Sequence, residues 1–449
     1  MAKKKFEVPV IQVVKPGMPG KTGMGQGYAP IKDIEGIPVS SLIEKYGSPF
    51  FIISENKLRE TYRKAYQAFS SRYPKVQFAW SYKTNYINAV CRVFHQEGAW
   101  AEVVSGFEYD KALFNEVPGN QIIFNGPMKS ENELTKSIEN QSVIHIDHFD
   151  ELIDLIRLSD SLKKKARVAI RINMDTGIFP KWDRFGFNFE NGEAWKAIEF
   201  IMQSEFLDLI GLHTHIGTYI LSTEAYRIAA QKMSGIAMDI HNSYGHSIQY
   251  LDLGGGFASA NTLKGAYHAA ADVVPSFDAY ADAITSAILQ QNWPGGDPPY
   301  LILETGRALV DEAGYLLSRV SATKRLSDGR RALILDVGIN MLFTSFWYEL
   351  EVHPGFDTTQ STDETDIVGP LCMNIDVIRK NLKYPLLEPG DPVVIPRVGA
   401  YNMTQWMQFI TFRPAIYLID ENQEVHMIRK EENLEYMQEL EQVPEHLKK

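Results

Sequence analysis

Val76-Gln77-Phe78-Ala79-Trp80-Ser81-Tyr82-Lys83-Thr84-Asn85 is an apolar run that closes on a lysine. Read with a period of two, the aromatic residues share one face, while Ala79, Ser81 and Lys83 share the other. A strand with one bulky and one small face is typical of a barrel wall, because the large face packs on helices and the small face borders the interior. We therefore expect Lys83 to point inward.

An inward lysine needs a partner or a chemical purpose, because its amine is strongly hydrated. Capture of a carbonyl group as a Schiff base is the commonest such purpose. The alternative is a strand-end lysine whose amine simply reaches solvent. The rest of the sequence decides between the two.

Apolar runs alternate with amphipathic helical stretches over residues 55–310, which is the sequence form of repeated βα units. Eight parallel strands with helices between them predict a (β/α)8 barrel, whose site lies at the C-terminal ends of the strands. Short strands broken by turns follow, so residues 311–449 are expected to form a second, all-β domain. Residues 1–54 are read as an N-terminal arm and a strand. The eight runs are 78–83, 101–105, 122–125, 143–147, 168–173, 210–216, 248–253 and 300–304.

Composition restricts the partners. The chain has 449 residues with 56 acidic and 45 basic side chains, a net charge of -11, which offers no field for nucleic acid or an anionic membrane. A small-molecule substrate is expected instead. Two cysteines are too few for a disulfide framework or a thiolate metal cage. With no apolar run of membrane-spanning length and no signal-peptide core, the cytoplasm is the expected location.

Polar residues gather at the predicted strand ends. Gly254-Gly255-Gly256 follows the seventh strand, and Glu304-Thr305-Gly306-Arg307 closes the eighth. Bare glycine N–H groups can approach an anion, and barrels often bind phosphate after strands seven and eight. Three glycines could also be a plain turn, but the nearby Arg307 favours phosphate.

An inward lysine and a phosphate cradle across the barrel mouth match pyridoxal 5'-phosphate (PLP), whose aldehyde reacts with an amine and whose ring withdraws electrons. The ring nitrogen works best when protonated, so a carboxylate is needed to hold that proton. Glu304 has the right chemistry for this task, and His215 could lie flat against the ring.

Eight motifs resemble those of the alanine-racemase-type (fold type III) PLP decarboxylases, the family of diaminopimelate, ornithine and arginine decarboxylases. The resemblance runs from about Glu35 to Phe412, and the motifs follow the family's order. They are Ser81-Tyr82-Lys83-Thr84-Asn85, Val104-Ser105-Gly106-Phe107-Glu108, Arg184-Phe185-Gly186, 213–218, Gly254-Gly255-Gly256-Phe257, Glu304-Thr305-Gly306-Arg307, Gly369-Pro370-Leu371-Cys372 and Gly399-Ala400-Tyr401.

The resemblance implies that Lys83 binds the cofactor covalently, that His215 stacks on the pyridine ring and that Glu304 pairs with its nitrogen. It further implies a β domain built from the N-terminal segment and the C-terminal third. The other cofactor-binding residues that it implies are Thr218, Gly255, Gly256, Arg307 and Tyr401.

Cys372 resembles the family thiol that lies opposite the leaving carboxylate and helps to protonate the product carbon. In the family this cysteine comes from the partner subunit. The resemblance therefore implies a homodimer with shared active sites.

Two departures bear on the substrate. Thr344 stands where diaminopimelate decarboxylases keep an arginine, and Met373 where diaminopimelate and ornithine enzymes keep an acid. The expected substrate is thus an amino acid or amino-acid conjugate whose distal end is not that of free diaminopimelate, as in siderophore or other secondary metabolism. Decarboxylation of diaminopimelate, ornithine or lysine itself is the alternative. The candidate substrate contacts are Arg184, Thr344, Tyr348, Met373 and Asp376.

Three other functions stay open on the sequence. The spacing of His213-Thr214-His215, with Lys83 as a carbamate, allows a metal-dependent barrel hydrolase, although we expect no metal. A PLP racemase or an inactive PLP-binding regulator could use the same barrel. The acidic stretch 357–366 is expected to be a solvated loop rather than a lid.

Overall fold

The computed structural model describes residues 29–266, 273–358 and 361–448, so most of the predicted N-terminal arm lies outside the described residues. Eight parallel strands close into a barrel, because the first strand, β4, pairs with the last, β12, and β8 pairs with β10. The predicted (β/α)8 barrel is therefore confirmed, with a strand at each of the eight runs. Its strands are β4 Val76–Ser81, β5 Trp100–Val103, β6 Ile122–Phe124, β7 Val143–Ile146, β8 Ala166–Asn173, β10 Leu207–His213, β11 Tyr250–Asp252 and β12 Tyr300–Leu303.

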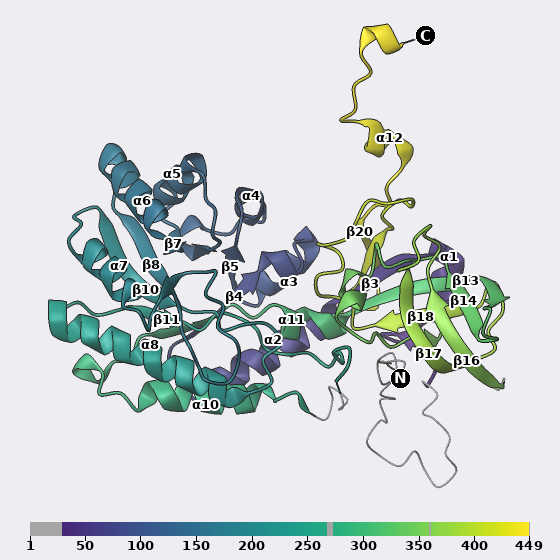
Figure 1. Cartoon of the computed structure of the whole chain (residues 1–449), viewed down its shortest axis with the longest axis horizontal. Coiled ribbons are helices and arrows are strands. Elements are labelled where there is room, and N and C mark those ends of the chain that lie inside the picture. The colour runs from purple at the N-terminus through teal and green to yellow at the C-terminus, as the bar shows by residue number, and fades with distance from the viewer. Residues whose placement is uncertain (1–28, 267–272, 359–360, 449) are drawn as a thin grey trace, which may run out of the picture.

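Helices surround the barrel on its outer side (Figure 1). Several begin with a serine whose hydroxyl accepts a backbone N–H of the first turn, as Ser54, Ser105 and Ser130 do. These helices are α2 Glu55–Ser70, α3 Asn88–Gln96, α4 Gly106–Phe114, α5 Glu131–Glu139, α6 Phe149–Leu162, α7 Glu193–Met202, α8 Thr223–Tyr244, α10 Phe277–Leu289 and the short α11 Arg307–Val310.

The two faces of β4 behave as the alternation predicts. Phe78 and Trp80 pack outward on the helices, and the Trp80 ring stacks on Phe94 of α3 with the centroids 3.9 Å apart. Ala79 points the other way, into an interior cluster that includes Ile210 and Ile302. The barrel is thus filled below its mouth, and the inward residues at the strand ends lie above this apolar floor.

A second sheet forms the β domain, beside the barrel in Figure 1. The strand order is β17-β16-β14-β13-β3-β19-β20, with β18 also paired to β13. The N-terminal segment contributes β3, which lies between β13 and β19. The strands are β3 Phe50–Ser54, β13 Gly314–Arg325, β14 Arg331–Leu335, β15 His353–Pro354, β16 Thr362–Val368, β17 Val377–Pro385, β18 Pro392–Pro396, β19 Ile416–Ile419 and β20 Val425–Arg429.

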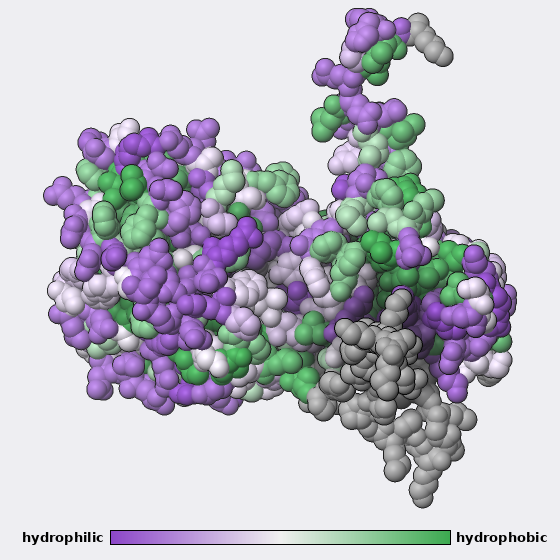
Figure 2. Space-filling model, viewed as in Figure 1, coloured by the Kyte–Doolittle hydropathy of each residue, from purple (hydrophilic) through white to green (hydrophobic). Residues whose placement is uncertain are grey.

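The acidic stretch was only partly a loop, because residues 362–366 belong to β16, which pairs with both β14 and β17. A few short elements complete the chain: β1 Asp33–Ile34, β2 Ile37–Pro38, α1 Val39–Tyr46, β9 Phe187–Asn188 and α12 Leu434–Gln438. The segment with α12 extends away from both domains, and hydrophobic residues gather at its base (Figures 1 and 2). Within the described ranges, no helix is long and apolar enough to cross a membrane.

Candidate active site

Lys83 lies just beyond β4, in a single turn of 3-10 helix over Tyr82–Thr84. Its Nζ donates to both carboxylate oxygens of Glu102, at 2.8 and 2.7 Å, while Ser81 Oγ donates to the same carboxylate at 2.6 Å. Ser81 and Glu102 are register partners on β4 and β5, so neighbouring strands place the pair. The inward direction predicted for Lys83 is confirmed.

The environment of Lys83 favours its charged form. Desolvation works to lower the pKa of the amine, but the negative charges of Glu102 and Glu304 outweigh it and hold the pKa above its usual value. Even so, 40% of the side chain is exposed toward the mouth. Lys129, in contrast, is buried and bonded to two backbone carbonyls and to Glu151. Of these two lysines, only Lys83 has a side chain that is exposed at the mouth and open to a ligand.

A loop of the β domain fixes the turn that carries Lys83. Tyr401 donates its backbone N–H to Thr84 O at 2.8 Å, and Thr404 Oγ1 donates to Lys83 O at 3.0 Å. From the barrel side, Asn85 Nδ2 donates to Gly399 O at 3.0 Å. The second domain therefore holds the lysine in place.

Glu304 is buried beyond the end of β12, within a polar cluster inside the barrel. Asn125 Nδ2 donates to Glu304 Oε1 at 2.6 Å, and His213 Nε2 lies 3.3 Å from Glu304 Oε2. Burial and the negative charge of Glu304 raise the pKa of Asp252 well above its usual value. The protonated form of Asp252 is therefore favoured.

His215 sits between the ends of β10 and β11 in its neutral form. Its Nδ1 accepts the backbone N–H of Gly255 at 3.1 Å, so Nε2 carries the ring proton. Burial and the positive charges of Arg171 and Lys83 hold its pKa well below its usual value. A β-carbon at Gly255 would lie 2.6 Å from Glu304 O, and Gly256, at φ +98°, faces Gly217 O in the same way. Only glycine fits this close approach of three strand ends.

Arg307 is buried and lies against two aromatic rings. Its guanidinium carbon is 5.1 Å from the ring centroid of Tyr348 and 4.7 Å from that of Tyr401. In the described part of the chain, its Nη1 has no hydrogen-bond partner. A buried donor of this kind calls for an anionic acceptor.

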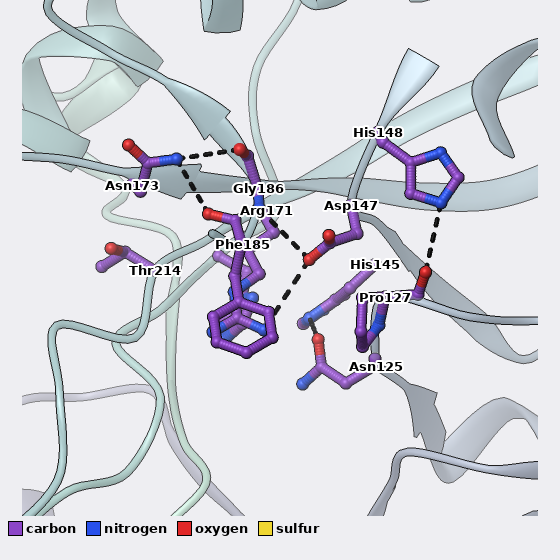
Figure 3. A network of polar contacts seen from close by, with 12 residues as sticks. Asn125, Pro127, His145, Asp147, His148, Arg171, Asn173, Phe185, Gly186 and Thr214 are labelled. Carbon is purple, nitrogen blue, oxygen red and sulfur yellow. Dashed lines mark hydrogen bonds and ion pairs between the residues drawn. The ribbon is translucent and has the colours of Figure 1, made fainter. Parts of the chain in front are cut away.

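Another cation, Arg171 on β8, lies in a polar network with Asp147 and Gly186 (Figure 3). Its Nη1 lies 3.8 Å from Asp147 Oδ1, and its guanidinium stacks on Phe185 at 4.7 Å. Asp147 Oδ1 also accepts the Gly186 N–H at 3.2 Å, and Asn173 Nδ2 donates to Gly186 O. This network fixes the loop that follows β8.

Comparison with known proteins identifies this arrangement. The family model for the pyridoxal binding domain of pyridoxal-dependent decarboxylases matches residues 58–311, more than half of the chain. The chain belongs to the pyridoxal-dependent decarboxylases. Among its relatives, diaminopimelate decarboxylase of Methanocaldococcus jannaschii is 29% identical over 444 residues, covering 94% of this chain and 99% of that protein. The Bacillus subtilis diaminopimelate decarboxylase is also 29% identical, over 90% of this chain and 93% of its own.

Solved structures agree with this membership. The crystal structure of the M. jannaschii enzyme matches with a TM-score of 0.85 at 29% identity, over 93% of this chain and 98% of that one. Diaminopimelate decarboxylase from Helicobacter pylori, complexed with L-lysine, matches with a TM-score of 0.79 at 27% identity, over 90% and 98% of the two chains. This pyridoxal-dependent decarboxylase is therefore an enzyme that uses PLP to decarboxylate an amino acid.

The residues present fit PLP. Arg307 supplies an unpartnered buried donor for a phosphate, and Lys83 an accessible amine for an aldehyde. Family membership also decides against a metal-dependent hydrolase and against an inactive regulator. The two histidines of His213-Thr214-His215 have different partners. His213 Nε2 faces Glu304, and His215 Nδ1 accepts the backbone N–H of Gly255.

Several predicted site residues lie apart from this cluster. Cys372, Met373 and Asp376 lie on the β-domain loop after β16, where Cys372 is exposed. Thr218 is exposed at the rim beyond β10, and Arg184 stacks on Phe185 at 5.2 Å. Apart from Thr218, the chain thus brings together the residues expected around the cofactor, and it leaves the Cys372 loop separate.

Thr344 and Tyr348 occupy one short turn at the edge of the site. Tyr348 donates its backbone N–H to Thr344 O at 2.9 Å and presents its ring to Arg307. Thr344 is buried, and its Oγ1 donates to Asn402 Oδ1 at 2.9 Å. Tyr348 therefore borders the Arg307 site, while the hydroxyl of Thr344 is already bonded within the protein.

Five interior residues were not singled out from the sequence. They follow the same inward alternation that identified Lys83, so their strand positions carried a signal. What the alternation could not show is that their polar groups meet. They are Glu102, Asn125, His145, Tyr250 and Asp252.

Proposed function

We propose that this enzyme decarboxylates an amino acid whose distal end is uncharged, such as an acylated or conjugated diamino acid. PLP supplies an electron-withdrawing ring that accepts the electron pair left by the departing carboxylate. Lys83 holds the cofactor's aldehyde, and its accessible amine, between Glu102 and the mouth, supports this role.

Glu304 pairs with the cofactor's ring nitrogen, and a buried carboxyl group at this position is suited to share a proton with it. Neutral His215 offers its ring face, since its in-plane Nδ1 is bonded to Gly255. Gly255, Gly256, Arg307 and Tyr401 bind the phosphate, and Thr218 contributes from the rim. The unpartnered Nη1 of Arg307 supports the phosphate position.

Cys372 donates a proton to the product carbon from a second copy of the chain. Its exposure on the β domain supports this arrangement, because the thiol is open to another subunit. The functional unit proposed is a homodimer with two shared sites. Met373, next to Cys372, then faces the same substrate.

The distal end of the substrate meets few charges in this proposal. Met373 stands where the family keeps an acid, and two aspartates of the β domain, Asp336 and Asp376, already accept hydrogen bonds within that domain. Asp376 accepts the backbone N–H groups of Ile339 and Leu371, each at 2.8 Å. Asp336 accepts the hydroxyls of Ser48 and Ser318.

The observation that carries the substrate proposal is this commitment of Asp376 and Asp336 to groups of their own domain. A distal ammonium left without a counter-charge would cost several kcal/mol, roughly, on burial. Arg184 at the rim and Tyr348 beside Arg307 line the approach without adding a carboxylate.

Matched substrate pairs test the proposal. Lysine against Nε-acetyl-lysine, and ornithine against Nδ-acetyl-ornithine, differ only at the distal amine. We expect kcat/KM to be at least about tenfold higher for each acylated member. Equal or higher values for the free diamino acids would overturn the substrate proposal and leave the decarboxylase assignment intact.

A second candidate is diaminopimelate decarboxylation. The observation that favours it is 29% identity to the M. jannaschii diaminopimelate decarboxylase over nearly the full length of both chains. A kcat/KM for meso-diaminopimelate of about 10⁴ M⁻¹s⁻¹ or more, the lower end for enzymes on their own substrates, would establish it.

A further inference from the structure

A line of hydrogen bonds crosses the barrel interior and ends on Glu304. Tyr250 OH lies 2.8 Å from His145 Nε2, His145 Nδ1 lies 3.0 Å from Asn125 Oδ1, and Asn125 Nδ2 lies 2.6 Å from Glu304 Oε1. The link between His145 and Asn125 is drawn in Figure 3. All four residues are buried and come from four different strands or strand ends.

The direction of this line is fixed from the Glu304 end. The Asn125 amide nitrogen faces the carboxylates of both Glu304 and Glu102. A carboxylate has hydrogen-bond acceptors and no donor, so the group that faces it must be the amide N–H. Asn125 Oδ1 must therefore face His145 and accept its Nδ1–H. The orientation of the amide decides which nitrogen of His145 carries the proton.

His145 is neutral, because burial and the nearby His213 hold its pKa well below its usual value. With the proton on Nδ1, Nε2 is an acceptor, and Tyr250 must donate its O–H to it. Burial keeps that phenol protonated by raising its pKa well above its usual value. Space for the Tyr250 ring comes from Gly211, where a β-carbon would overlap the ring.

We propose that Tyr250, His145 and Asn125 are positioning residues that act through Glu304. Every donor in the line points toward the Glu304 carboxylate, so the line holds that carboxylate as a hydrogen-bond acceptor in one orientation. A carboxylate held this way keeps the cofactor's ring nitrogen protonated. This inference rests on the proposed pairing of Glu304 with that nitrogen.

The test compares PLP with 1-deaza-pyridoxal phosphate, which has carbon in place of the ring nitrogen, as ligands of the apoenzyme. Asn125→Leu should weaken PLP binding about tenfold and binding of the analogue about twofold or less, since only PLP uses the carboxylate. Tyr250→Phe should weaken PLP binding about threefold. With ¹⁵N-labelled PLP, the ring-nitrogen NMR signal of the Asn125→Leu enzyme should shift toward the unprotonated position.

Two further variants make the outcome decisive. Tyr73→Phe removes another buried phenol, one that donates to Pro299 O outside this line, and should leave the ratio of the two affinities unchanged. Glu304→Gln should abolish the preference for PLP. If Glu304→Gln does so while Asn125→Leu and Tyr250→Phe weaken both ligands equally, the positioning role is overturned and the Glu304 assignment stands.

If Glu304→Gln leaves the preference unchanged, the pairing of Glu304 with the ring nitrogen is wrong, and the inference falls with it. Tyr250→Phe removes a single oxygen atom and should fold normally. It carries the test if Asn125→Leu does not fold.

Discussion

The polar side chains of the barrel interior are bonded to one another, whereas the Cys372 loop leaves its cysteine side chain exposed. Inside the barrel, Lys83, Glu102, Asn125 and Glu304 are tied to one another by side-chain hydrogen bonds across strands. On the β-domain loop, Asp376 secures the backbone, and the side chain of Cys372 is exposed. A network of this kind preorganises a fixed chemistry, whereas an exposed loop can change its side chains without disturbing the fold. Under the proposed function, cofactor chemistry and substrate choice are thus assigned to separate parts of the chain.

The largest loss of activity is expected from removing the Lys83 amine in the barrel. Lys83→Ala should reduce turnover by about 10⁴-fold or more, because no other group can hold the cofactor's aldehyde in its place. Borohydride treatment followed by mass spectrometry should no longer attach the cofactor to the chain. Substantial activity in this variant without added amine would contradict the assignment of Lys83.

Removing the Cys372 thiol from the loop should reduce turnover less than removing the Lys83 amine. Cys372→Ala should still bind cofactor and substrate but turn over about 10²-fold more slowly, with some release of pyridoxamine phosphate, because proton donation to the product carbon is impaired.

Mixing inactive subunits tests whether the site is shared. Equal amounts of Cys372→Ala and Lys83→Ala chains should recover roughly a quarter of wild-type activity, the share of intact sites that random pairing gives in a symmetric dimer. No recovery after verified subunit exchange would argue against a shared site.

The buried barrel side should also respond to pH through Glu108, which accepts the Val104 N–H at 2.8 Å. Burial raises the pKa of the Glu108 carboxyl from its ordinary value of 4.5 to about 7. The folded protein therefore keeps a proton that the unfolded chain loses, and stability should fall as pH rises from about 4.5 to 7. Glu108→Gln should remove about 3 kcal/mol of this pH dependence in denaturant titrations. An unchanged pH dependence would count against the raised pKa.

The smallest effect is expected from adding a negative charge to the Cys372 loop, which tests its part in substrate choice. Met373→Glu restores an acid beside Cys372 and should raise kcat/KM for free lysine about fivefold, since a partly exposed charge pair is worth up to about 1 kcal/mol. Ile375→Glu, an exposed position on the same loop, is the matched control and should have little effect. Equal gains in both variants would point to a general charge effect.

Much of this molecule was predictable from residue order. The alternation around Lys83 predicted the barrel wall and the inward lysine. Along a barrel strand, side chains alternate between the helices outside and the interior, so the bulky face determines which residues point inward. The β domain was expected from its turns, but the acidic stretch was misread, because pairing with β14 and β17 orders residues that carry charge. Long-range partners override local composition in this way.

The interior network could not be read in advance. His145 and Tyr250 are 105 positions apart, and their hydrogen bond depends on strand register and on the space left by Gly211. Similarly, the sequence offered Asp376 as a substrate contact, and only the fold shows that its oxygens hold Ile339 and Leu371. Pairings set by closure of a sheet have no local signature.

The position of β3 has a consequence for biosynthesis. This buried strand, Phe50–Ser54, pairs with β13 on one edge and β19 on the other, while the barrel is encoded between them. A chain leaving the ribosome therefore exposes an apolar strand until residues some 260 and 360 positions later emerge. The β domain cannot complete its sheet during most of translation, whereas the barrel strands can pair as they appear. Assembly of the support for the Lys83 turn, which comes from the loop at Tyr401, is accordingly one of the last events of folding.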